Sequence, residues 1–275
     1  MTIKFETRTL GPIAAKFINE FLQEGKSIFS LEEAAIVYKQ NKSKTSSFLK
    51  NLVNRGVLAR IKSGSYLILQ MGQENVQLSN WPVIARELAK PHAYFISHFS
   101  AMRMHGMSTH PLLDIYITLT NRQRNRKFYN IQYHFIYAKP KHFWGAIDLW
   151  ISKHEKVMVS DLERTILDGL ERPDLCGGIK EVTKGIWTKI NEVNWDKLRH
   201  YIKKYKTIAA IKRLGYILEL LNIGSEHINF IQKIIASANG YILLDPSEPK
   251  TGKYLKRWRI RLNINPQELK ASVWE

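Results

Sequence analysis

The sequence predicts an α+β fold in two domains, and three observations lead to this prediction. Three helical patterns followed by two strand-like runs occupy the first seventy residues. Beyond them, β-rich segments come first and amphipathic helical segments follow, which is typical of segregated α+β folds rather than of βαβ alternation. At 275 residues the chain is also longer than one average domain. We therefore expect one domain at residues 1–75 and a larger mixed α/β domain at 76–275.

The first two predicted elements are helices. Pro12 opens a run with helical apolar spacing, and Gly25 terminates it. Ser30 and Glu33 have the spacing of a capping box, in which each side chain accepts the backbone N–H of the other residue. A second helix is therefore expected from Leu31 to about Tyr38.

A third helix is predicted over residues 42–55, with an apolar face and a polar face that lacks acidic residues. At 100° per residue the apolar face consists of Thr45, Phe48, Leu49, Leu52 and Val53. Hydroxyls, amides and lysines form the other face, and such side chains approach phosphates and base edges in a DNA groove. No Asp or Glu occurs between Glu33 and Glu74.

Two strand-like runs, Val57 to Ile61 and Tyr66 to Leu69, follow around a tight turn at Gly64. Helix, helix, basic helix and hairpin is the order of a winged helix-turn-helix, which favours DNA binding. The expected DNA contacts are Lys42, Ser43, Lys44, Ser47, Lys50, Asn51, Asn54, Arg55, Arg60, Lys62 and Ser63. A winged helix used for protein contacts, or a solvated face, remains the alternative.

The predicted domain boundary lies within a polar, turn-rich segment at residues 71–82, where Pro82 should break any helix. Two β-rich segments, 114–120 and 130–138, are expected to form a hairpin around a basic loop. The loop residues Arg122, Arg124, Arg126 and Lys127 are either solvated or a second contact to nucleic acid or a partner.

Residues 159–178 concentrate acids and an arginine, and we interpret them as structural. Ser160 and Glu163 have capping-box spacing, and Arg164 can pair with Asp168 four residues later. A metal-dependent nuclease needs convergent carboxylates, and the spacing of the acids here, even with Asp114, Asp148 and Glu155 added, indicates no such site. We expect no catalytic residue, metal or cofactor, and a nuclease is the alternative.

The cysteine and three of the histidines are also interpreted as structural rather than catalytic or metal-binding residues. Cys176 is the only cysteine, which excludes an internal disulfide, and it is predicted to be a packed residue rather than a nucleophile. His98, His105 and His110 could hold a metal, although core or surface positions are the favoured interpretation.

Near the C-terminus, Trp258, Ile260 and Leu262 alternate with arginines. A strand here would bury one face and present Arg257, Arg259 and Arg261 on the other. Such a row binds phosphates or acidic partners, or protects an exposed edge strand by its charge.

The net charge and the hydropathy of the whole chain limit the classes of protein to which it can belong. A formal net charge of +18 favours a polyanionic partner such as double-stranded DNA. No apolar run approaches the length of a membrane span, and the N-terminus carries acid and lacks an apolar signal core. We expect a cytoplasmic protein without a membrane partner.

Three segments of the second domain resemble the AbiEi family of antitoxins and transcriptional regulators. They are "YFISHFSAMRMHGM", "VSDLERTILDGLERPDLCGGIKEV" and "YILLDP" with the later "RWRIRLNIN". The resemblance implies a winged-helix autorepressor that binds promoter repeats. It also implies an antitoxin that counters a nucleotidyltransferase-like toxin in a type IV toxin–antitoxin (abortive infection) system, without a stable complex. The family's DNA-binding helix would map onto Lys42 to Arg55, and no catalytic residue carries over.

Overall fold

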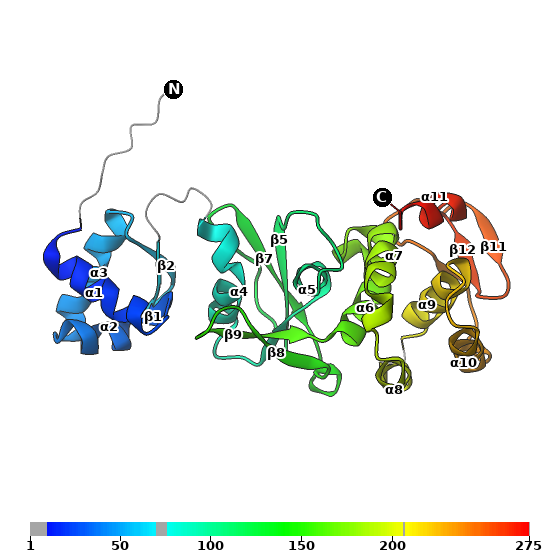
Figure 1. The fold of residues 1–275 in the computed structure, drawn as a ribbon, viewed down its shortest axis with the longest axis horizontal. Helices are drawn as coiled ribbons and strands as arrows, with labels where there is room; N and C mark the ends of the chain where they lie inside the picture. Colours follow the sequence, from blue (N-terminus) through cyan, green and yellow to red (C-terminus); the bar gives the residue numbers. More distant parts are fainter. Residues whose placement is uncertain (1–9, 70–75, 206, 275) are drawn as a thin grey trace, which may run out of the picture. The chain divides into compact units, whose positions relative to one another are not determined.

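The computed structural model describes residues 10–69, 76–205 and 207–274. Helices and strands are mixed along the chain, and its strands form three sheets within the described residues (Figure 1). The chain divides into two compact units. The first runs to Ala93 and also includes residues 127–131 and 148–157, and the second comprises 94–126, 132–147 and 158–275. The predicted boundary between residues 75 and 76 falls at the edge of residues 70–75, which lie outside the described residues.

Three helices and a three-stranded antiparallel sheet form the beginning of the first unit. The strands are arranged in the order β1-β3-β2. The elements are α1 (Pro12–Gln23), β1 (Ile28–Ser30), α2 (Leu31–Tyr38), α3 (Lys42–Asn54), β2 (Leu58–Lys62) and β3 (Ser65–Ile68). The three predicted helices and the two predicted strands occur where their patterns indicated. The three-residue β1 was not predicted, because it is too short to show a period.

Local capping and aromatic packing explain why this segment folds as it does. The Ser30–Glu33 capping box is present, with both side chains bonded to the other residue's backbone N–H at 3.1 and 2.8 Å. Phe21 stacks on Phe29, and Tyr38 stacks on Phe48, each pair with ring centroids 4.2 Å apart. Thr45, Leu49 and Leu52 of α3 are buried, so the predicted apolar face is the packed face.

The helix α4 (Val76–Ala89) contains Pro82 in its interior, so the prediction that this proline breaks the helix is wrong. An interior proline costs about 3 kcal/mol because it removes a hydrogen bond and crowds the preceding turn. Burial of the apolar residues beside it offsets this cost; these are Trp81, Val83, Ile84, Ala85 and Leu88.

A six-stranded mixed sheet has the strand order β6-β7-β5-β4-β9-β8. Its strands are β4 (Tyr94–Ile96), β5 (Asp114–Leu119), β6 (Arg126–Phe128), β7 (Ile131–Tyr137), β8 (Ala146–Trp150) and β9 (Lys156–Ser160). The predicted hairpin of the two long segments is wrong, because β5 and β7 are parallel, with Asp114 opposite Gln132 and Leu119 opposite Tyr137. Parallel neighbours need a returning connection, and this one includes β6 at the sheet edge.

The second unit is largely helical after β9. Its core contains α6, which contacts α7, α8 and α9, and Figure 1 shows α6 and α7 side by side. The helices are α5 (His98–Met104), α6 (Leu162–Glu171), α7 (Gly178–Lys189), α8 (Trp195–Tyr205), α9 (Ile208–Leu220), α10 (Ser225–Ile235) and α11 (Pro266–Ala271). A small sheet of β10 (Ile242–Leu243), β12 (Ile260–Leu262) and β11 (Lys253–Leu255) completes the unit. None of the described helices combines the length and the apolar character that crossing a membrane requires.

Candidate nucleic-acid interface

The polar face of α3 is exposed and free of carboxylates. Asn41 caps the helix, and its side-chain oxygen accepts the backbone N–H of Lys44 at 2.9 Å. Arg55, at the end of the helix, is half-buried. The exposed residues among the predicted DNA contacts of α3 are Lys42, Ser43, Lys44, Ser47, Lys50, Asn51 and Asn54. Lys42 pairs with Glu32 of α2 at 2.8 Å, in an exposed ion pair that competing phosphates can replace at low cost.

The hairpin after α3 contributes two further exposed side chains. The Arg60 guanidinium donates to the Ser63 hydroxyl at 3.3 Å, and both residues are exposed. Lys62 differs from the prediction. Its ammonium group donates to the carbonyl oxygens of Glu87 and Lys90 at 2.5 and 3.1 Å, and it pairs with the Glu87 carboxylate at 3.3 Å. Lys62 therefore connects the hairpin to α4, and these bonds occupy the ammonium group that the sequence predicted to contact DNA.

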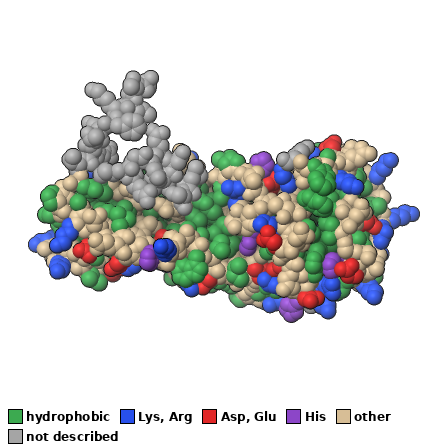
Figure 2. Space-filling view, viewed as in Figure 1, with side chains coloured by type: hydrophobic (Ala, Val, Ile, Leu, Met, Phe, Trp, Pro, Cys, Tyr) green, Lys and Arg blue, Asp and Glu red, His purple; other side chains and the backbone are tan. Residues whose placement is uncertain are grey.

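Basic side chains occur over both units. Figure 2 shows Lys and Arg scattered over the described part of the face in view, with Asp and Glu among them. The net charge of +18 is therefore not confined to one patch. The distinguishing feature of α3 is the absence of acids from its exposed face, rather than a high density of positive charge.

The predicted basic loop is exposed but is not a hairpin loop. Arg122, Arg124, Arg126 and Lys127 lie on the connection between β5 and β7. The Arg122 guanidinium lies 5.2 Å from the centre of the Tyr137 ring, which keeps this side chain near the end of β7.

The expected arginine row is not present as one strand face. β12 begins at Ile260, so Arg257 and Arg259 precede it in a turn, and Arg259 has a left-handed backbone with φ of 50°. Arg257 pairs with Glu219 at 2.5 Å, and Arg259 donates to the carbonyl oxygen of Ala238. Arg261 lies 5.2 Å from the ring centre of Tyr254. Turn formation separates the three guanidiniums and directs them to partners in the same unit.

The acid-rich stretch from Val159 is a buried framework. Asp161, rather than Ser160, caps α6, and its side chain accepts the backbone N–H of Arg164 at 2.8 Å, so the predicted Ser160–Glu163 capping box is wrong. Ser160 instead bonds the Thr165 hydroxyl at 2.8 Å. Glu163 accepts the backbone N–H of Asn194 at 2.8 Å.

The tyrosine and lysine of α8 hold this framework from the other side. The Tyr201 hydroxyl donates to Asp161 at 2.8 Å, and burial together with this bond raises the pKa of Tyr201 to about 12. Lys197 pairs with both Asp161 and Glu163, at 3.1 and 2.9 Å. The predicted pair of Arg164 and Asp168 is present at 2.8 Å.

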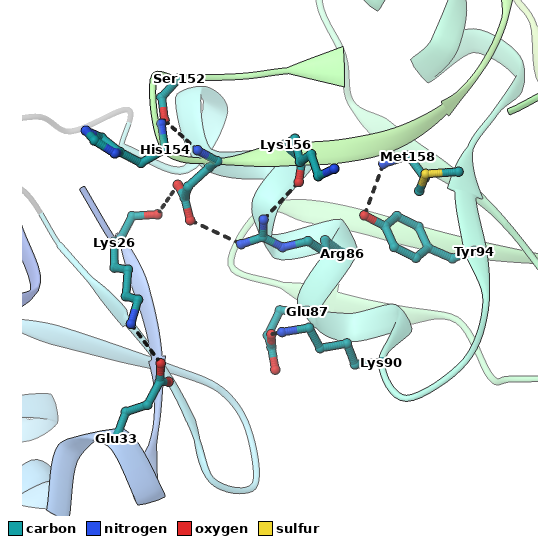
Figure 3. A network of polar contacts seen from close by, with 12 residues as sticks. Lys26, Glu33, Arg86, Glu87, Lys90, Tyr94, Ser152, His154, Lys156 and Met158 are labelled. Carbon is teal, nitrogen blue, oxygen red and sulfur yellow. Dashed lines mark hydrogen bonds and ion pairs between the residues drawn. The ribbon is translucent and has the colours of Figure 1, made fainter. Parts of the chain in front are cut away.

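The other candidate acids do not converge with this framework. Asp114 bonds His134 at 2.9 Å, and Asp148 pairs with Lys156 at 2.5 Å. Figure 3 shows Arg86 of α4 at the loop between β8 and β9, where its guanidinium donates to the Glu155 carboxylate at 3.1 Å. Ser27 donates to the same carboxylate at 2.9 Å. Within the described residues, no three His, Cys, Asp or Glu side chains are grouped as metal ligands.

The cysteine is buried, and each of the three candidate histidines contacts a neighbouring residue of the second unit. Cys176 is buried in the core of the second unit, and burial raises the pKa of its thiol. His105 bonds the carbonyl oxygen of Ser160 at 2.6 Å, and His110 lies 3.4 Å from the Glu181 carboxylate. His98 is buried beside a pocket of the second unit.

Comparisons with known proteins bear on the fold. No family model and no curated protein matches the sequence. Among solved structures, the fold is similar to the crystal structure of the RV2827C protein from Mycobacterium tuberculosis, with a TM-score of 0.72 over 98% of this chain and 97% of that chain. The two sequences are 11% identical, so this likeness concerns the architecture alone.

Proposed function

We propose that residues 10–69 form a winged helix-turn-helix and that the protein binds double-stranded DNA through α3 and the β2–β3 hairpin. The observation that carries this proposal is the exposed face of α3, which presents lysines, hydroxyls and amides without a carboxylate. Its second support is the arrangement of α1, α2 and α3 with an antiparallel hairpin directly after α3. In this arrangement α3 enters the major groove, and the hairpin lies on the phosphate backbone.

The exposed residues divide into two roles. Ser43, Ser47, Lys50 and Asn51 carry donors and acceptors that can reach base edges from a helix in the groove. Arg60 on the hairpin is suited to a phosphate, because its guanidinium has only an exposed hydroxyl as its hydrogen-bond partner among the described residues.

Substitution of Lys50 tests this proposal. Fluorescence anisotropy would compare the wild type and Lys50→Ala on the DNA upstream of the gene and on a scrambled duplex, over a salt series. We expect Lys50→Ala to weaken binding to the native duplex by about tenfold, the usual cost of losing one groove contact. Lys16→Ala is the matched control, since it removes an exposed lysine from α1 in the same unit.

Two results would contradict the proposal. Equal binding to the native and scrambled duplexes would leave only a general attraction between the +18 protein and DNA. Equal losses in Lys50→Ala and Lys16→Ala would show that α3 has no special role. Magnesium-containing samples run on a denaturing gel would reveal strand cleavage, which the alternative of a metal-dependent nuclease requires.

We further propose that the protein is an autorepressor and the antitoxin of a type IV toxin–antitoxin system, acting against a nucleotidyltransferase-like toxin without a stable complex. The support is the resemblance to the AbiEi family together with the way its segments meet in the second unit. Asp245 of "YILLDP" accepts the backbone N–H of Ile179 at 2.6 Å, at the start of α7. Asn263 of "RWRIRLNIN" accepts the backbone N–H of Asp245 at 3.0 Å. Segments distant in sequence thus belong to one packed framework.

Co-expression tests the antitoxin role separately from DNA binding. Cells expressing the neighbouring toxin should regain growth with the wild type and also with Lys50→Ala, because α3 belongs to the DNA-binding unit. Failure of the well-folded wild type to restore growth would refute the antitoxin role. Rescue by the wild type but not by Lys50→Ala would show that neutralisation depends on the DNA-binding face.

A further inference from the structure

The second unit contains a pocket of about 500 Å³ that the acid-rich framework does not explain. Thr118 near the end of β5 and Tyr137 at the end of β7 line it. Asp168 and Glu171, from the C-terminal part of α6, also line it. Because β5 and β7 are parallel, their carboxyl ends meet at one edge of the sheet, which is where open sheets commonly bind ligands.

Cations outnumber carboxylates in the lining of this pocket. Arg122, Lys139, Arg164 and Arg172 are cationic, whereas Asp168 and Glu171 are the acids. The buried pair of Arg164 and Asp168 is neutral as a unit. Arg172 also forms two short bonds to Asp174, at 2.9 and 2.7 Å, which fix its guanidinium at the rim.

Two of the cations are available to a ligand. Arg122 follows β5 and Lys139 follows β7, and both side chains are exposed. Within the described parts of the chain, neither forms an ion pair with an acidic residue, and Arg122 contacts the Tyr137 ring. Cations without a carboxylate partner at the mouth of a pocket favour an anionic ligand.

The side chain of His98 adds a directed hydrogen-bond donor. His98 is 5% exposed and has a left-handed backbone with φ of 52°, a conformation that costs energy for a residue with a side chain. The Thr118 hydroxyl donates to the Ser97 hydroxyl oxygen at 2.8 Å, and this oxygen lies 2.9 Å from Nδ1 of His98. When the Ser97 hydroxyl donates to Nδ1, the neutral imidazole carries its proton on Nε2.

The surroundings keep this imidazole neutral near physiological pH. Burial lowers the pKa of His98, the carboxylate of Asp168 opposes this shift, and the guanidiniums of Arg172 and Arg164 add to it. Within the described residues, Nε2 makes no hydrogen bond of its own, although the side chain lines the pocket. An N–H group that is buried in this way is a ready donor to an anion.

We propose that this pocket binds the phosphate group of a small phosphorylated ligand, with Arg122 and Lys139 as charged contacts and Nε2 of His98 as a hydrogen-bond donor. A volume of about 500 Å³ suits a ligand the size of a sugar phosphate or a mononucleotide. The inference does not depend on DNA binding by α3, because every residue in it belongs to the second unit.

Isothermal titration calorimetry of the full chain provides the test, with inorganic phosphate, glucose 6-phosphate and AMP as probes. Glucose and adenosine are their uncharged controls. We expect saturable binding of the phosphorylated probes alone, weakened at least about fivefold in Arg122→Gln and in Lys139→Gln through loss of a charge-assisted contact. Arg124→Gln, an exposed arginine of the same connection that does not line the pocket, should leave this binding unchanged.

A third variant tests the buried donor. His98→Asn retains a residue type that tolerates a left-handed backbone but removes the imidazole, and thermal melting would establish that it is folded. This variant should also bind the probes more weakly. Absence of saturable binding of all three phosphorylated probes to the wild type would overturn the proposal. Equal loss in Arg122→Gln and Arg124→Gln would do so as well, because it would reduce the effect to general attraction by the surface.

A DNA titration of the same variants separates a small ligand from nucleic acid at this surface. If Arg122→Gln and Lys139→Gln weakened DNA binding and left phosphate binding intact, the connection between β5 and β7 would contact nucleic acid instead. That outcome would refute a phosphate site while leaving the proposed role of α3 untouched.

Discussion

Two arginine–aspartate pairs of similar length should differ sharply in their contribution to stability, because one is buried and the other is exposed. The Arg164 and Asp168 side chains are 6% and 4% exposed, whereas those of Arg172 and Asp174 are 50% and 35% exposed. Removing one member of a buried pair leaves the other charge in a poorly solvated position. An exposed pair loses little, because water and salt already screen it.

We therefore expect Asp168→Ala to lower the free energy of unfolding by about 3–5 kcal/mol. The expected loss for Asp174→Ala is at most about 1 kcal/mol. Urea denaturation of the two variants and the wild type would measure both values. Equal losses would show that the surroundings of Arg164, including the Trp144 ring 4.2 Å away and the His142 carbonyl oxygen, stabilise its charge without Asp168.

At the scale of an element, the β2–β3 hairpin carries two basic residues with different tasks. Lys62 is bonded to α4, and Arg60 is exposed two residues earlier. We expect Lys62→Ala to lower stability by about 1–2 kcal/mol, because it leaves the mostly buried Glu87 carboxylate with fewer partners. Arg60→Ala should change stability by less than about 0.5 kcal/mol.

The same pair of variants should show the opposite order in DNA binding. Arg60→Ala should weaken binding to native and scrambled duplexes alike and reduce the salt dependence, as loss of a phosphate contact does. Lys62→Ala should bind normally at temperatures where it is folded. Weaker binding by folded Lys62→Ala, with Arg60→Ala unaffected, would restore Lys62 as the phosphate contact and contradict the structural assignment.

The elements also show which features a sequence can reveal. The Ser30 capping box, the period of α3 and the Arg164–Asp168 spacing are local, and each is found as predicted. The parallel pairing of β5 and β7 could not be predicted, because a strand pattern contains no information on its partner.

The two candidate sites, the exposed face of α3 and the pocket beside His98, also differ in whether the sequence reveals them. The acid-free face of α3 is visible in the sequence, since its residues are three or four positions apart. The pocket beside His98 is not, because residues from five separated segments line it and only the fold brings them together. The bonding of Lys62 is not visible in the sequence for the same reason, since its partner Glu87 lies 25 residues away on α4.

At the scale of the whole molecule, each of the two units consists of segments that are separated in sequence. This restricts the positions at which the chain can be cut into fragments that fold. Residues 127–131 and 148–157 belong to the same unit as α4, although they follow it in sequence. Within that unit, Arg86 of α4 is bonded to Glu155 and to the carbonyl oxygen of Lys156. A fragment that begins at residue 76 keeps these contacts, whereas one that begins at residue 94 loses them.

Fragment 76–275 can distinguish a dedicated DNA-binding face from general attraction by positive charge. Residues 1–75 contain 11 Lys and Arg against 6 Asp and Glu, a net charge of +5, so the fragment keeps +13 of the total +18. Because it retains α4 and the whole six-stranded sheet, we expect it to melt cooperatively, whereas fragment 94–275 lacks the bonds of Arg86 to Glu155 and Lys156 and should melt at a lower temperature. If α3 is the DNA-binding element, folded fragment 76–275 should lose all preference for the native duplex in anisotropy measurements, despite keeping most of the charge. If it still prefers the native duplex over the scrambled one, sequence recognition lies in the second unit, and the exposed face of α3 has another purpose.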